Sequence, residues 1–174
     1  MQSLAKAFRL DDEGWMRHAN PWSVWTRVAI LPLFVAAVWS RVWIGGWAMV
    51  PVAALIVWAW ANPRAFPPPA AMESWASRGV LGERIWLNQT LVPIPRHHAR
   101  IAALLAVLSG LGLFPLAWGL YTLSPSVTAC GFVVTLGAKM WFIDRMVWLY
   151  EDMRAAPPDR PAGHATGQQG PPFR

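Results

Sequence analysis

The stretch PSVTACGFVVTLGAKMWFIDRMVWLYEDM, residues 125–153, decides the fold class of this 174-residue chain. Its first half is apolar, and charged residues appear only from Lys139 onward. A helix of roughly 29 residues is about 43 Å long, which exceeds the bilayer's hydrocarbon core of about 30 Å. We therefore predict a membrane-spanning helix whose last turns leave the bilayer, with Asp144 and Arg145 near the interface. Lys139 alone lies deep enough to need a partner or a path to the interface.

The composition of the whole chain agrees with a membrane protein. Hydrophobic residues make up 55% of the sequence and charged residues 14%, and there are 13 tryptophans. These values exclude an ordinary soluble domain, and tryptophan favours the bilayer interface. The net charge of +6 is better explained by basic loops facing anionic head groups than by nucleic acid, which we do not expect as a partner. Cys130 is the only cysteine, which excludes an intrachain disulfide.

Four apolar runs predict an all-α, polytopic membrane protein with two transmembrane hairpins. Asn20 followed by Pro21 is a typical helix start, and Ser124 followed by Pro125 repeats it. Glycines in the last two runs suggest close helix approach. The four predicted spans are residues 21–39, 42–61, 101–123 and 125–153. The glycines are Gly110, Gly112, Gly119, Gly131 and Gly137.

The remaining segments divide the chain into a lead (1–20), a first hairpin (21–61), a central loop (62–100), a second hairpin (101–153) and a tail (154–174). Within the loop, residues 73–89 have the partly amphipathic pattern of an interfacial helix lying on the membrane. The tail is rich in proline and glycine, so we expect it to be disordered.

The distribution of Lys and Arg predicts the orientation. On the side opposite to the termini only Arg41 is basic, whereas the lead, the loop and the tail carry many basic residues. By the positive-inside rule, both termini and the central loop are cytoplasmic. The first 20 residues lack an apolar core for a cleavable signal, so the first span is expected to direct insertion into the plasma membrane.

Polar residues gather in four strings that are all expected at the cytoplasmic interface. These strings are residues 17–27, 82–89, 95–100 and 144–153. Arg27 and Asp144 have matched depth and opposite charge, so we predict that they pair.

Metal binding and catalysis have little support in the sequence. His18, His97 and His98, with Glu83 or Glu151, are the candidate metal ligands. Adjacent histidines diverge on a helix, and no H-x-x-H or E-x-x-H spacing is present, so we predict no metal and no cofactor. No nucleophile elbow and no phosphate-binding glycine loop is found.

Several word-like strings carry a resemblance to a known family. They are HANPWSVWTR, NPRAFPPP, WASRGVLGERIWLN and KMWFIDRMVWLYEDM, within residues 17–153. Together they resemble a family of small bacterial and archaeal integral membrane proteins classed only as a domain of unknown function. The resemblance implies a prokaryotic membrane protein without an assigned activity, and it transfers no catalytic residue.

Three functional hypotheses remain open. The leading one is a non-catalytic membrane component that presents its cytoplasmic surface to a protein partner or to anionic lipid. The second is an interfacial enzyme acting on a lipid or amphiphile, with His97, His98 or Asp144 as acid or base. The third is a homo-oligomeric transporter or channel with Lys139 and Asp144 along its path. In the enzyme hypothesis, an anionic head would be held by Arg17, Arg78, Arg84 and Arg96.

Overall fold

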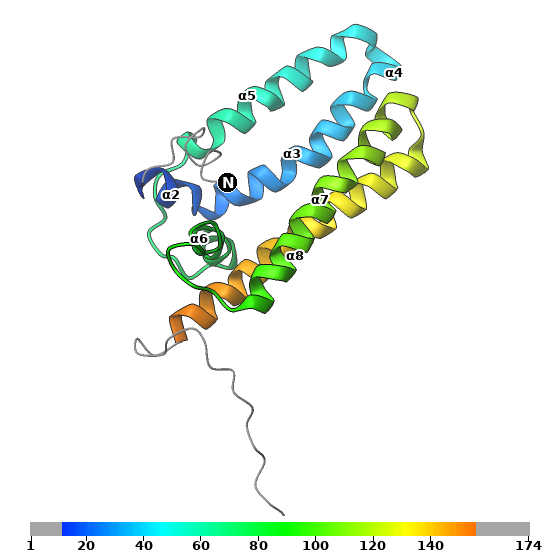
Figure 1. Ribbon diagram of the computed structural model, residues 1–174. Helices are drawn as coiled ribbons and strands as arrows, with labels where there is room; N and C mark the ends of the chain where they lie inside the picture. Colours follow the sequence, from blue (N-terminus) through cyan, green and yellow to red (C-terminus); the bar gives the residue numbers. More distant parts are fainter. Residues whose placement is uncertain (1–11, 156–174) are drawn as a thin grey trace, which may run out of the picture.

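The computed structural model describes residues 12–155, and this part of the chain is all-helical. Two long antiparallel hairpins form its body, and two shorter helices lie at one end (Figure 1). The first hairpin consists of α3 (Pro21–Trp39), α4 (Arg41–Ile44), η1 (Gly45–Ala48) and α5 (Met49–Ala65). The second consists of α7 (Arg96–Thr122) and α8 (Pro125–Ala155), and the shorter helices are α2 (Asp12–His18) and α6 (Trp75–Leu87).

Three helical stretches are long and apolar enough to cross a membrane: Pro21–Ala65, Arg96–Thr122 and Pro125–Ala155. The predictions of an all-α fold and of membrane-spanning helices are confirmed to this extent. The first stretch reverses its direction at α4, so that α3 and α5 lie side by side (Figure 1).

The helix starts follow the sequence signals. The backbone N–H of Trp22 donates to the Asn20 side chain at 2.9 Å, and Pro21 is the first residue of α3. Pro125 likewise begins α8. The break between the first two runs is longer than predicted, since α5 begins only at Met49. Gly45, at a φ of +57°, supplies the left-handed backbone at this reversal.

Glycines determine how closely α7 and α8 approach. A Cβ on Gly131 would lie 2.2 Å from the backbone nitrogen of Leu116, and a Cβ on Gly119 would lie 2.4 Å from that of Thr128. The expected close approach therefore occurs at Gly112, Gly119 and Gly131. It does not occur at Gly110 or Gly137, which have open space where a side chain would be.

Helix α6 closes one end of the second hairpin, and Figure 1 shows it nearly end-on. A helix within residues 73–89 was predicted, but its buried face packs against α8. A Cβ on Gly82 would lie 1.9 Å from the Met146 carbonyl oxygen. Beside this contact, the Trp86 and Phe142 rings meet edge to face at 5.4 Å between centroids. Protein contacts with α8 therefore position this helix.

A buried polar network joins α3 to α5. The Ser23 hydroxyl donates to Asn62 Oδ1 at 2.8 Å, and Asn62 Nδ2 donates to Thr26 Oγ1 at 2.7 Å. Both Ser23 and Asn62 are fully buried. The two hairpins, in contrast, contact each other sparsely, and α6 bridges them.

Candidate ligand-binding cavity

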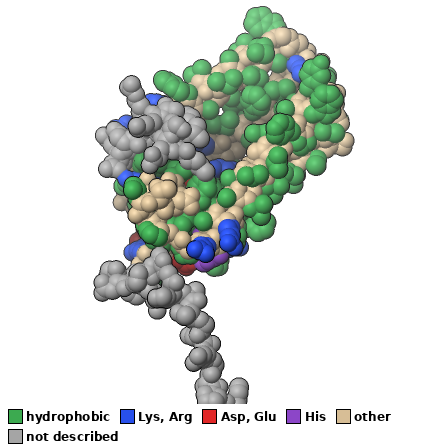
Figure 2. All heavy atoms as spheres, viewed as in Figure 1, with side chains coloured by type: hydrophobic (Ala, Val, Ile, Leu, Met, Phe, Trp, Pro, Cys, Tyr) green, Lys and Arg blue, Asp and Glu red, His purple; other side chains and the backbone are tan. Residues whose placement is uncertain are grey.

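A cavity of about 340 Å³ lies where α3, α6 and α8 meet. We call it the charged cavity, because its lining includes Arg27, Glu83 and Lys139. Figure 2 shows a hollow between the two apolar hairpins, with Lys and Arg side chains at its end near α6. The remaining lining residues are His18, Val24, Val28, Leu31, Gly79, Val80, Ser109, Thr135, Leu136 and Ile143.

Lys139 finds its partner in this cavity. Its ammonium nitrogen lies 3.7 Å from Glu83 Oε1 and 4.7 Å from the centroid of the Phe142 ring. The Lys139 side chain is 48% exposed and Glu83 is 26% exposed, so both reach the cavity surface. The charge that the sequence leaves unexplained is therefore neutralised by a carboxylate of α6.

Arg27 lies against His18, and its Nη2 donates to the His18 carbonyl oxygen at 3.1 Å. Burial, and then the positive charges of Arg27 and Lys139, lower the pKa of His18 from 6.5 to about 3. The imidazole is therefore neutral at physiological pH and can accept a hydrogen bond from the guanidinium.

The predicted pair between Arg27 and Asp144 does not form. Asp144 Oδ1 instead accepts a hydrogen bond from Trp75 Nε1 at 3.1 Å. Within residues 12–155 no carboxylate is in salt-bridge contact with Arg27. Helix α6 packs against both α3 and α8, and its Trp75 bonds Asp144, whereas Arg27 contacts His18 of α2.

The charged cavity is electropositive. Two permanent cations, Arg27 and Lys139, face one carboxylate, Glu83, and the nearby histidine is neutral. Apolar side chains of α3 and α8 continue the lining away from these charges. The cavity thus combines the features that would suit a ligand with an anionic head and an apolar body.

A second, apolar hollow of about 300 Å³ follows farther along the same two helices. Val35 of α3 and Phe132 of α8 line it. On α3, Val28 and Leu31 of the charged cavity lead to Pro32 and Val35 at helical spacing. The two hollows therefore follow one face of α3 from its polar end toward its apolar end.

The predicted anion-binding arginines are not gathered in the charged cavity. Arg78 pairs with Glu151 at 2.6 Å on the surface, and Arg96 is exposed at the start of α7. Arg17 and Arg84 are half-buried outside the cavity lining. Arg145 places its guanidinium 5.8 Å from the centroid of the Trp148 ring.

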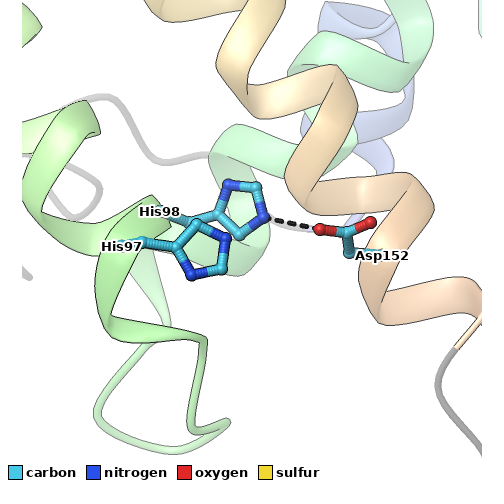
Figure 3. Close-up of side chains that lie close together, drawn as sticks. All are labelled: His97, His98 and Asp152. Carbon is cyan, nitrogen blue, oxygen red and sulfur yellow. Dashed lines mark hydrogen bonds and ion pairs between the residues drawn. The ribbon is translucent and has the colours of Figure 1, made fainter. Parts of the chain in front are cut away.

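The predicted metal and catalytic candidates divide between two places. His18 and Glu83 line the charged cavity, whereas His97 and His98 lie beside Asp152 at the end of α8 (Figure 3). The His98 imidazole contacts Asp152 Oδ2 at 2.7 Å. The carboxylate beside His97 and His98 is therefore that of Asp152, and not that of Glu83 or Glu151 as expected.

The chain matches a family of unknown function (DUF6653) over residues 1–168. The chain belongs to this family. No curated protein and no solved structure matches the chain. Membership in the DUF6653 family agrees with the sequence resemblance and brings no assigned activity to the charged cavity.

Sequence reasoning missed the role of Glu83 as the partner of Lys139. One signal was available. Glu83 follows Gly79 and Val80 at helical spacing, so it lies on the face of α6 whose small side chains allow close packing. Asp152 had no such signal, because its contact with His98 joins residues far apart in the sequence.

Proposed function

We propose that this protein is a non-catalytic membrane component that binds the anionic head group of a lipid or similar amphiphile in the charged cavity. The observation that carries the proposal is Arg27. Its guanidinium lines a half-enclosed cavity, its neighbour His18 is neutral, and no carboxylate of the described residues forms a salt bridge with it. A cation so placed near a low-dielectric interior binds anions more strongly than an exposed one.

The shape of the surroundings supports an amphiphile over a small free anion. The apolar hollow beyond the charged cavity, between α3 and α8, continues in the direction that a hydrocarbon chain would take. Lys139 adds a second cation beside Arg27, and Glu83 limits the excess charge. A phosphate or carboxylate head would then contact Arg27 while its tail lies along α3.

The same proposal includes the membrane arrangement. We propose four crossings, because the stretch Pro21–Ala65 folds back on itself at Gly45, with both termini in the cytoplasm. The charged cavity would then open near the cytoplasmic face of a prokaryotic plasma membrane, where anionic head groups occur.

The state of His18 favours a binding role for the cavity over one in which His18 acts as a catalytic acid or base. With a pKa lowered to about 3, the imidazole at this cavity is a weak base at neutral pH. The interfacial enzyme and the homo-oligomeric transporter remain hypotheses. The catalytic candidates of the enzyme hypothesis, His97, His98 and Asp144, do not line this cavity.

Native mass spectrometry in a mild detergent tests the proposal. We expect retained phosphatidylglycerol in preference to phosphatidylcholine, and we expect Arg27→Gln to reduce this preference by about tenfold, roughly 1.4 kcal/mol. Arg27→Lys, which keeps the charge, should recover part of it. Arg64→Gln is the matched control, because Arg64 lies over the Trp60 ring at the end of α5, outside the cavity. Equal loss in Arg64→Gln, or no loss in Arg27→Gln, would refute the proposal.

A further inference from the structure

Three metal-ligating side chains meet where α7 begins and α8 ends. His97, His98 and Asp152 each offer one ligand atom, and all three atoms lie within 4.8 Å of one another (Figure 3). None of the three lines the charged cavity. This cluster therefore needs an explanation of its own, independent of the proposed function.

The start of α7 brings the two histidines together. They occupy its second and third positions, directly after Arg96, and their rings tilt at 39° with 4.2 Å between centroids. Adjacent side chains on a helix normally diverge, which was the argument against a site. Here the His97 ring turns back toward His98, so both can face Asp152 from the opposite helix (Figure 3).

His98 is held firmly in this arrangement. It is only 3% exposed, and its Nε2 lies 2.7 Å from Asp152 Oδ2. Its Nδ1 is buried without a hydrogen-bond partner among the described residues. Packing therefore fixes the His98 ring with one nitrogen facing the carboxylate. An ion that replaces the hydrogen-bonded proton would find this side chain already ordered.

The two carboxylates that the sequence suggested as metal ligands with these histidines are in ion pairs elsewhere. Glu151 pairs with Arg78 at 2.6 Å, and Glu83 lies by Lys139. Asp152 is 56% exposed and His97 is exposed, so the cluster is open to solvent on one side. An ion can enter from there, and water can complete its coordination.

We infer that His97, His98 and Asp152 bind a divalent transition-metal ion, with Zn²⁺ as the best match. Two imidazole nitrogens and one carboxylate oxygen suit Zn²⁺, whereas Mg²⁺ and Ca²⁺ prefer oxygen ligands alone. The bound ion would tie the start of α7 to the last turns of α8. It would thereby stabilise the end of the second hairpin.

Zinc titration of the full-length protein tests this inference. The protein is purified in detergent with an affinity tag that contains no histidine, and Zn²⁺ affinity is measured by competition with a chelating indicator. We expect one ion per chain, and a rise in unfolding temperature with Zn²⁺ because the ion binds the folded state. Asp152→Asn keeps an oxygen that can accept from His98 but loses the charge, and it should weaken binding at least about tenfold.

Three further variants separate this site from adventitious binding. His97→Ala removes an exposed side chain, so it should lower Zn²⁺ affinity without unfolding the protein. His164→Ala, in the tail outside the described residues, and Glu151→Gln should leave affinity unchanged. Wild-type affinity in both His97→Ala and Asp152→Asn, or loss of binding in His164→Ala, would overturn the inference.

Discussion

At the scale of single residues, each charge near the apolar helices has a specific neighbour. Lys139 is paired by Glu83, Asp144 accepts from a tryptophan, and Arg27 lies against a neutral histidine. Burying a charge without a partner would cost several kcal/mol, of the order given for membrane interiors. Arg27 is the exception, because the side chain that it lies against, His18, carries no opposite charge, and Glu83, whose charge also acts on Arg27, is in ion-pair contact with Lys139. That imbalance is the basis of the proposed anion site.

Asn62 gives the first prediction at this scale. Asn62→Ala leaves the buried Ser23 hydroxyl without its acceptor and removes the bond that Asn62 donates to Thr26, so the free energy of unfolding should fall by about 1–3 kcal/mol. Asn88→Ala is the control, since Asn88 is exposed and its side chain donates to the nearby Arg84 carbonyl; a change within about 0.5 kcal/mol is expected. Chemical denaturation in detergent measures both. Similar losses in the two variants would contradict the role of the network.

His18 gives a prediction about pH. Its pKa is about 3 in the folded protein and 6.5 in the unfolded chain, so below pH 6.5 the unfolded state binds the extra proton. Stability should therefore fall on acidification, by at most about 2 kcal/mol from pH 7 to pH 5 for this group. His18→Gln, which does not titrate, should reduce this dependence. The unfolding midpoints of the wild type and of His18→Gln, compared at each pH, measure the effect. An unchanged pH dependence in the variant would show that His18 is not the source of the dependence.

At the scale of elements, α6 is positioned by glycine. Gly82 lets the α6 backbone touch that of α8 at Met146, and a methyl group at this position has no space. The contact holds Glu83 beside Lys139, and it places α6 between α3 and α8. The geometry of the charged cavity therefore depends on one close helix crossing.

Gly82→Ala tests this dependence. The added methyl group should separate α6 from α8 and lower the free energy of unfolding by about 1–3 kcal/mol. Gly110→Ala is the matched control, because a Cβ there meets nothing within 4 Å; alanine favours a helix by up to about 1 kcal/mol, so no loss is expected. Thermal unfolding followed by tryptophan fluorescence compares the two. A Gly82→Ala protein as stable as the control would show that the crossing tolerates a side chain.

At the scale of the whole molecule, a closely packed second hairpin and a largely exposed first hairpin are joined weakly. Close glycine contacts unite α7 and α8, and a polar network unites α3 and α5, but between the hairpins α6 makes the principal bridge. The hollows lie along this weak seam. A ligand in the seam would add contacts between the hairpins.

The proposed four crossings are tested by labelling single cysteines in a Cys130→Ala background. Gly46→Cys lies at the reversal between α3 and α5, where a side chain has open space, and Thr90→Cys is exposed after α6. An impermeant maleimide should label Gly46→Cys only in right-side-out vesicles and Thr90→Cys only in inverted ones. Labelling of both cysteines from the same side would contradict the proposed arrangement.

The sequence by itself determined the helical class of this protein, the presence of helices apolar enough to cross a membrane, and the starts of α3 and α8. Long apolar runs and the Asn-Pro and Ser-Pro starts act locally, so they can be recognised without a structure. Glycine spacing indicated close packing of the last two helices, although only the structure distinguishes Gly131, which is in contact, from Gly137, which is open.

The tertiary structure alone decided the charged cavity and the cluster at His98. The predicted pair of Arg27 and Asp144 does not form, because Trp75 of α6 bonds Asp144 and His18 of α2 lies against Arg27. His98 and Asp152 are far apart in the sequence and meet because α7 and α8 are antiparallel. Such pairings depend on how neighbouring helices are rotated against one another, which the periodicity of a single segment does not encode.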